Sequence, residues 1–411
     1  NNSSVYYISI SDPPILSLKS GWYNQDQFLI MNTDSLSKIY YTINGDLPDT
    51  NDNLYIDTIF LDSTTVISAR VFRDSSCLPS KVIDRTYFFN EDNFDLPVFS
   101  IITDSLNLWD WETGIYVLGP NAGPPPYYSD ANFRMDWSKW SRLEFFDSNR
   151  NKQAEEELDL EIHGGFSRRS PQKSFRLDFK SRYTGDIEYP MISQKPYINR
   201  FNNLNLRNGG STPGYHIRIK DGFLCDLASE THVDVMGYEP CIVYLNGKYW
   251  GQYGIREKID GNYIEDNYSI NSDNINLLNK DGVLEGTDIN FIQSYHEIMN
   301  ADSSSISFFD LLSNVFDIDN YIDYFIFQTY IQNRDWYGGS NNMKIWSANG
   351  GKWRYVVYDL EQSFLHDPDI DFISFVRDPY HLSFSSFTLD STNSERSYHS
   401  ELFNKALSND L

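Results

Sequence analysis

Apolar and polar positions first follow a strand pattern. Between residues 12 and 90, short runs such as 38–43 and 65–71 combine β-branched, aromatic and polar residues, and turn signals such as 44–48 separate them. None of these runs has a helical period. Short strands at regular spacing are typical of a β-sandwich of immunoglobulin-like size. We therefore predict an N-terminal β-sandwich.

A polar stretch at 90–95, ahead of Pro97, separates this region from the rest of the chain. Domain boundaries fall in such stretches, so we predict an accessory domain over 1–93 and a second domain over 94–411. In the second domain the pattern predicts strands at 142–146, 158–162 and 170–179, a helix at 221–236, a hairpin of 241–245 with 249–256, polar helices within 285–318, a buried helix at 321–331 and a second hairpin of 344–346 with 353–358. The fold class is therefore α+β.

Charge and cysteine content exclude several functions. Lys and Arg number 33 and Asp and Glu number 58, which gives a net charge of −25. Such a chain repels nucleic-acid backbones and anionic lipid, so we expect no nucleic-acid partner. No apolar run approaches the roughly 18 residues of a membrane span. The three cysteines form no C-x-x-C pair, which excludes a zinc knuckle or thioredoxin motif.

Two features between predicted strands can contact phosphate. The loop 163–170 contains Gly164, Gly165 and Ser167, and such a loop can bring backbone N–H groups close to phosphates; a plain hairpin turn is the alternative. Lys173 shares the apolar face of the next strand, because residues two apart point the same way. A buried lysine needs a partner or a task, whereas a lysine at the strand end could extend into water.

Carboxylates follow two apolar segments in the last part of the chain. Asp335 comes directly after the predicted buried helix, with Asn342 shortly beyond it, and Asp359 ends an apolar strand. Phosphoryl transfer needs a carboxylate to accept the nucleophile's proton and oxygen ligands to hold Mg²⁺. The alternatives are a helix cap with a turn, and a strand that simply exits to solvent.

In this order the motifs resemble the spore coat protein H (CotH) kinase family from about residue 96 to the end. The resemblance rests on 96–100, 114–117, Ser170-Pro171-Gln172-Lys173-Ser174-Phe175, 243–251, 253–260, Asn333-Arg334-Asp335 and Tyr358-Asp359-Leu360-Glu361. It implies an atypical, two-lobed protein-kinase-like domain that uses ATP with Mg²⁺ or Mn²⁺ to phosphorylate serine in protein substrates. We expect further helix beyond residue 411, so this domain would be truncated at its C-terminus.

The resemblance also implies roles for single residues. Asp335 would be the catalytic aspartate, and Asp359 and Asn342 the metal ligands. The implied nucleotide-binding residues are Lys173, Ser167 in the glycine-containing loop, Arg207 near the family's cleft arginine, and Glu257 where the chain crosses between lobes. Asp226 or Glu230, on the predicted helix, would be the polar partner of Lys173, and motif register favours Asp226. Glu361 stands where the family usually has aspartate.

The N-terminal region resembles the chitobiase and hexosaminidase C-terminal module, on residues 41–48 and 67–70. The chain begins with Asn1 and has no apolar leader, so we expect an extracellular or cell-surface protein whose signal peptide has been removed. Two alternatives stay open: a catalytically silent kinase-fold adhesion module, and a carbohydrate-binding protein that contacts cell-surface polysaccharide through its N-terminal module.

Overall fold

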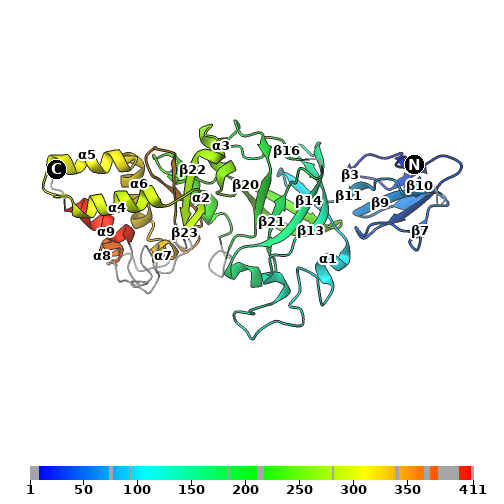
Figure 1. Ribbon diagram of the computed structural model, residues 1–411. Coiled ribbons are helices and arrows are strands. Elements are labelled where there is room, and N and C mark those ends of the chain that lie inside the picture. Colours follow the sequence, from blue (N-terminus) through cyan, green and yellow to red (C-terminus); the bar gives the residue numbers. More distant parts are fainter. Residues whose placement is uncertain are drawn as a thin grey trace, which may run out of the picture. The chain divides into compact units, whose positions relative to one another are not determined.

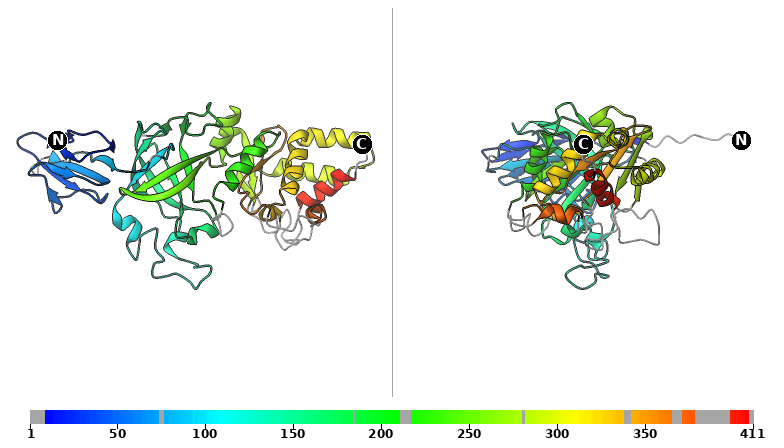
Figure 2. Two further views of the ribbon diagram at one scale, coloured as in Figure 1. Left: turned by 180° about the vertical axis from the view of Figure 1, so that it is seen from behind. Right: turned by 90° about the vertical axis from the view of Figure 1, so that its left-hand side faces the viewer.

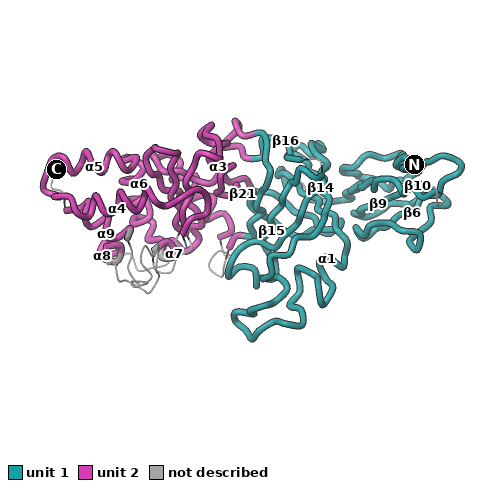
Figure 3. The backbone as a smooth tube through the Cα atoms, in the orientation of Figure 1, with its two compact units in different colours: residues 1–191, 199–208, 240–255 teal, residues 192–198, 209–239, 256–411 magenta. Residues whose placement is uncertain are grey.

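The computed structural model describes residues 9–73, 77–92, 94–183, 185–210, 217–279, 282–337, 342–364, 371–377 and 398–408. The chain divides into two compact units (Figure 3). Unit 1 comprises residues 1–191, 199–208 and 240–255, and unit 2 comprises residues 192–198, 209–239 and 256–411.

Unit 1 begins with the predicted sandwich-like β region (Figure 1). Its main sheet has the strand order β3 (Gly21–Tyr23), β11 (Ile83–Phe89), β9 (Thr65–Phe72), β6 (Lys38–Thr42) and β7 (Asn53–Leu54). Two-stranded sheets pair β2 (Ile15–Leu16) with β5 (Met31–Asn32), β4 (Gln27–Leu29) with β8 (Ile59–Leu61), and β1 (Ser9–Ile10) with β10 (Cys77–Leu78). One apolar core joins side chains from these strands, among them Leu29, Ile39 and Ile67.

The second part of unit 1 is a closed barrel, which the sequence did not predict. Its strand order is β12 (Val98–Ile102), β13 (Lys139–Phe146), β14 (Lys152–His163), β15 (Ser174–Asp178), β18 (Asn203–Arg207), β21 (Lys248–Arg256) and β20 (Tyr238–Leu245). Parallel pairing of β12 with β20 closes it. The predicted tight turn joins β20 to β21, because both Asn246 and Gly247 have positive φ.

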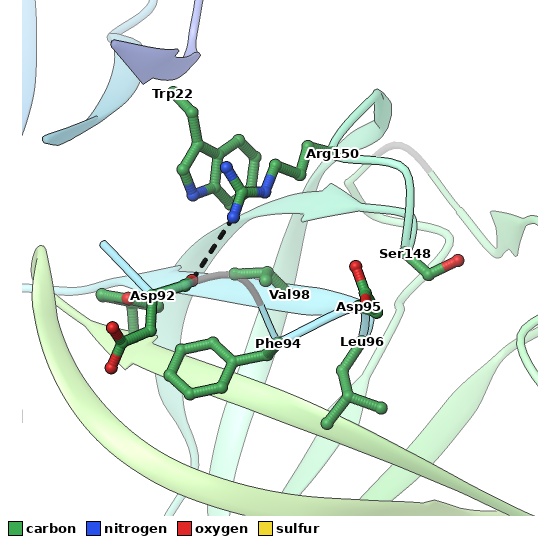
Figure 4. A pocket seen from close by; sticks show the side chains of 9 residues that line it. Trp22, Asp92, Phe94, Asp95, Leu96, Val98, Ser148 and Arg150 are labelled. Carbon is green, nitrogen blue, oxygen red and sulfur yellow. Dashed lines mark hydrogen bonds between the residues drawn. The ribbon is translucent and has the colours of Figure 1, made fainter. Parts of the chain in front are cut away.

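Strand β11 of the sandwich packs against the barrel through an aromatic cluster. Phe88 stacks on Trp22 and meets Phe146 and Tyr244 edge-on. Figure 4 shows a cavity of about 10 Å³ beside this cluster, where the Arg150 guanidinium lies over Trp22 and donates to the Asp92 carbonyl oxygen. That volume holds about one water molecule. The sandwich and the barrel therefore pack against each other within unit 1.

Unit 2 combines a small sheet with helices. The strand order is β19 (Asp234–Val235), β25 (Arg354–Val357), β24 (Lys344–Ala348), β22 (Ile275–Asn279) and β23 (Gly282–Glu285). The α-helices are α2 (Lys220–Ser229), α3 (Gly261–Tyr268), α4 (Ile289–Asn300), α5 (Ile306–Val315), α6 (Ile318–Tyr330), α7 (Arg334–Tyr337), α8 (Phe372–Arg377) and α9 (Tyr398–Leu407). Helix α4 contacts α5 and α9, and α8 contacts both α6 and α9. These helices therefore form one group at the C-terminal end of the chain (Figures 1 and 2).

Two predictions for unit 2 are wrong in detail. The helix predicted over 221–236 ends at Ser229, because Asp234 and Val235 instead pair in parallel with β25. The helix predicted to be buried all round, α6, exposes Ile322 and Ile326 on one side. Within the described residues, no helix is both long and apolar enough to cross a membrane.

Candidate active site

Asp335, Asn342 and Asp359 come together in unit 2. The Asn342 side-chain Nδ2 lies 3.0 Å from Asp335 Oδ2 and 3.3 Å from the Asp359 carbonyl oxygen, and it donates to both. Asp335 stands on the short helix α7, Asn342 precedes β24 and Asp359 follows β25. The short helix α7, the segment before β24 and the segment after β25 therefore meet at one buried amide.

A tight turn after helix α6 determines the position of Asp335. Gln332 adopts positive φ, which ends that helix. Asn333 is fully buried; its Oδ1 accepts from the Asp335 backbone N–H at 3.2 Å, and its Nδ2 donates to Gln328 Oε1 at 2.9 Å. Trp336, also fully buried, anchors helix α7 in the core. The neighbours of Asp335 therefore fix its backbone while the residue itself remains exposed.

The electrostatic environment favours a proton or a cation at Asp335. Nearby protein atoms desolvate its carboxyl, and the negative charge of Asp359 adds to this effect, so the pKa of Asp335 is raised above its ordinary value. The hydrogen bond from Asn342 opposes the shift. A carboxylate with a raised pKa accepts a proton more readily at neutral pH than an ordinary aspartate.

The same residues suit a hard divalent cation. Mg²⁺ is usually held by one or two carboxylates together with substrate phosphates. Asp359 would supply a carboxylate, and Asn342 Oδ1 would be a further oxygen ligand. Within the described residues there is no cluster of three or more His, Cys, Asp or Glu side chains able to hold a metal by protein ligands alone. The donor set therefore fits a cation that shares its ligands with a phosphate.

Lys173 lies in unit 1, just before β15, and is 4% exposed. Its ammonium donates to the carbonyl oxygens of Arg168 at 2.7 Å and Ser170 at 3.0 Å, and it lies 4.1 Å from the centre of the Phe133 ring. Burial, and secondly the charge of Arg134, lower the pKa of Lys173 to about 8. The predicted position on a buried face is confirmed, and the alternative of a lysine extended into water is wrong.

The other two unit 1 candidates lie on elements next to Lys173. Ser167 is buried on the 3₁₀ turn η2 (Phe166–Arg169), which lies in the loop that connects the antiparallel strands β14 and β15. Arg207 ends β18, the strand that pairs with β15, and is half-buried.

Asp226 and Glu257 lie in unit 2, where both have partners from that unit. Asp226, exposed on α2, accepts from Gln194 Nε2 at 2.8 Å. Glu257 is buried and accepts from Lys195 Nζ and from the Gly237 backbone N–H, both at 2.6 Å. Sequence reasoning missed Lys195, because nothing in its local pattern marks a buried lysine.

Sequence reasoning also missed Asp221 and Arg256, which are linked by contacts to the residue that follows Asp359. Asp221 Oδ1 accepts from the Leu360 backbone N–H at 2.8 Å, and Asp221 Oδ2 lies 3.2 Å from Arg256 NH2. Arg256 directly follows the buried residues of strand β21, and Asp359 likewise follows a buried strand. The strand-end argument that identified Asp359 could therefore have identified Arg256.

Comparison with known proteins gives two family matches. The sequence model of the family described as CotH kinase protein matches residues 160–410, and that of the chitobiase/beta-hexosaminidase C-terminal domain matches residues 18–83. A search of curated proteins gave no match. Both resemblances expected from the sequence are thereby confirmed. The first match spans more than half of the chain and includes Asp335, Asn342 and Asp359.

Proposed function

Because the chain belongs to the CotH kinase protein family, we propose that it is a metal-dependent protein kinase that transfers the ATP γ-phosphoryl group to serine. The observation that carries this proposal is the contact of Asn342 with both Asp335 and the Asp359 backbone. We also propose a two-lobed, kinase-like arrangement for residues 94–411. The order of elements supports it: a lysine before a strand, then a helix, an aspartate on the short helix α7, an asparagine before β24 and a strand-end aspartate.

In the proposed reaction Asp335 accepts the proton of the serine hydroxyl. The serine oxygen then forms a bond to the γ-phosphorus, the bond from that phosphorus to the β–γ bridging oxygen breaks, and ADP leaves. Asn342 holds the Asp335 carboxylate through Oδ2. The raised pKa of Asp335 suits this task, because a better proton acceptor is a better general base.

Asp359 and Asn342 would hold Mg²⁺ or Mn²⁺, which supplies positive charge to the phosphates when bound. Lys173 would add a second positive charge at the phosphates from unit 1. Since the whole chain carries −25, a triphosphate is repelled by the net charge, and local positive charge is needed to reverse this.

Mass spectrometry of a protein substrate after incubation with ATP and Mg²⁺ tests the proposal. A casein-like, serine-rich acceptor and the chain itself serve as substrates, and Asp335→Asn serves as the control. We expect a phosphoryl mass on serine with the parent protein and a greatly reduced signal with the control. An adenylyl mass would show nucleotidyl transfer instead. Equal phosphorylation by parent and a folded Asp335→Asn protein would overturn the assigned base.

A further inference from the structure

The peptide unit between Asp359 and Leu360 is held at both of its polar groups. Its carbonyl oxygen, from Asp359, accepts from Asn342 Nδ2, and its N–H, from Leu360, donates to Asp221 Oδ1 at 2.8 Å. Asp359 also has a φ of +57°, in the left-handed region. A non-glycine residue rarely adopts this conformation without supporting contacts. The two hydrogen bonds therefore fix the backbone that aims the Asp359 carboxylate.

Asp221 is itself held through its second oxygen. Oδ2 lies 3.2 Å from NH2 of Arg256, a side chain that is 1% exposed. The same nitrogen lies 3.1 Å from Cys225 Sγ, and the guanidinium lies over the Tyr238 ring. An arginine surrounded in this way has little freedom to turn, so the orientation of the Asp221 carboxylate is set by the core of unit 2.

Helix α2 makes a further contact with the same loop. Lys220, the residue before Asp221, donates its ammonium to the Ser363 carbonyl oxygen. The first two residues of α2 therefore hold the loop at two points, directly after Asp359 and four residues after it. A first-turn aspartate can also serve only its own helix, by its favourable interaction with the helix dipole. That role needs neither the Leu360 contact nor the Arg256 contact.

We propose that Asp221, backed by Arg256, is a positioning residue that sets the direction of the Asp359 carboxylate toward the metal. The inference rests on the proposed function, since it assigns Asp359 to a divalent cation. Residues that orient a metal ligand typically contribute about 10–100-fold to metal affinity or activity. Asp221→Ala removes both the Leu360 and the Arg256 contacts, whereas Asp221→Asn keeps an oxygen acceptor for the Leu360 N–H but loses the charge and turns an NH₂ donor toward Arg256.

Mn²⁺ binding to the full chain in the presence of a non-hydrolysable ATP analogue, measured by titration calorimetry or electron paramagnetic resonance, tests this without any turnover. Asp319→Asn is the matched control, because Asp319 is also a first-turn aspartate of a unit 2 helix, but it is exposed. We expect Asp221→Ala to bind Mn²⁺ about 10–100-fold more weakly than the parent, Asp221→Asn to lose less, and Asp319→Asn to match the parent. Faster hydrogen exchange at the Leu360 amide should accompany the loss in Asp221→Ala.

The outcomes separate the inference from the proposed function. If a folded Asp221→Ala protein binds Mn²⁺ as the parent does, while Asp359→Asn does not, the positioning role is overturned and the metal site stands. If Asp359→Asn binds Mn²⁺ as the parent does, or the parent binds none, both are overturned. Unchanged Leu360 exchange in Asp221→Ala also contradicts the positioning role, whatever the stability of the variant.

Discussion

Asn342 donates hydrogen bonds to the Asp335 carboxylate and to the Asp359 carbonyl oxygen. The two aspartates have different surroundings, and these suit different tasks. Asp335 is exposed, has a raised pKa and can be reached by an acceptor hydroxyl. Asp359 is half-buried, and its backbone is fixed on both sides. The exposed group suits proton transfer, and the fixed group suits a metal that must not move.

Neutralising these two aspartates should therefore give different defects. Asp335→Asn should lower turnover by about 10²–10⁴-fold while Mg·ATP still binds, because a general base acts in the transition state. Asp359→Asn should weaken Mg·ATP binding as well as turnover. Calorimetric titration with Mg·ATP and initial rates for each variant check this, with Asp310→Asn, an exposed helix residue, as the control. The same loss of Mg·ATP affinity in both variants would contradict the separation of roles.

ATP binding should depend on the protonation of Lys173. Its pKa is lowered to about 8, so its positive charge is present below that pH and is lost as the pH rises through it. We expect ATP affinity to fall between about pH 7 and pH 10, where an ordinary lysine would still be charged. In Arg134→Gln the fall should move to higher pH, because the charge of Arg134 is the second cause of the shift.

Lys173→Arg is the matched control, since a guanidinium stays charged over this whole pH range. Its ATP affinity should not show the fall near pH 8. A parent protein whose ATP affinity is constant from pH 7 to pH 10 would count against a contact between Lys173 and phosphate.

Single residues could be predicted where local pattern and burial agree. Lys173 and Asp359 each stand out because a charge adjoins an apolar strand, and a charge there needs a reason. Asp221 and Lys195 could not be assigned in this way, because their partners are distant in sequence. Asp221 contacts Leu360 across 139 positions, and no spacing rule links residues so far apart.

At the scale of elements, the sheet of unit 2 depends on one buried carboxylate. Asp234 on β19 is 3% exposed and accepts from Arg354 Nε at 3.1 Å and from Trp346 Nε1 at 2.7 Å. Burial alone would lower the pKa of Arg354, but the hydrogen bonds that Arg354 donates to Asp234 raise it. These contacts join β19, β24 and β25, the strand that leads to Asp359.

Asp234→Ala should therefore destabilise unit 2 strongly. Removing the carboxylate leaves the buried Trp346 N–H without its acceptor and leaves Arg354 paired with Asp317. Removing one side of a buried pair typically costs up to about 3–5 kcal/mol. Urea denaturation gives the free energy of unfolding, and Asp319→Ala, an exposed aspartate, is the control with an expected change below about 0.5 kcal/mol. A loss below 1 kcal/mol for Asp234→Ala would mean that water or another side chain replaces the carboxylate.

Elements with strong local signals were predictable, and those made by distant pairing were not. The Asn246-Gly247 turn was identified from two residues, since both must adopt positive φ. The predicted helix over 221–236 extended too far, because the two-residue strand β19 exists only through its pairing with Val356 and Val357. The barrel was missed for the same reason, as its closure pairs Val98 with Ile242.

At the scale of the whole molecule, the sandwich covers charged positions on the barrel strand β13. Arg142 on that strand is 4% exposed, lies 3.0 Å from Asp84 of β11 and donates to the Gly45 carbonyl oxygen. Glu144, fully buried, accepts from the Thr86 backbone N–H at 2.7 Å. The sequence predicted the sandwich and several strands of the barrel, but not that the sandwich completes the burial of the barrel.

Removing residues 1–93 should consequently destabilise the barrel. The truncated protein would expose the faces of Phe146 and Tyr244 that pack on Phe88, and it would leave Arg142 without Asp84. Exposed apolar area of this kind favours self-association. We expect a lower melting temperature and concentration-dependent oligomers for residues 94–411, measured by calorimetry and light scattering against the full chain.

A point variant separates the loss of this interface from the loss of a whole domain. Asp84→Ala in the full chain removes the partner of Arg142 and leaves the aromatic cluster in place, so it should destabilise by about 3–5 kcal/mol without oligomers. Asp62→Ala, an exposed aspartate of the same β region, is the control. The sandwich would be an accessory that the barrel does not need if two results held. Residues 94–411 would be monomeric with the melting temperature of the full chain, and Asp84→Ala would leave the free energy of unfolding unchanged. The aromatic and charged contacts of β11 predict the opposite, because a buried arginine and a buried glutamate persist only where partners compensate them.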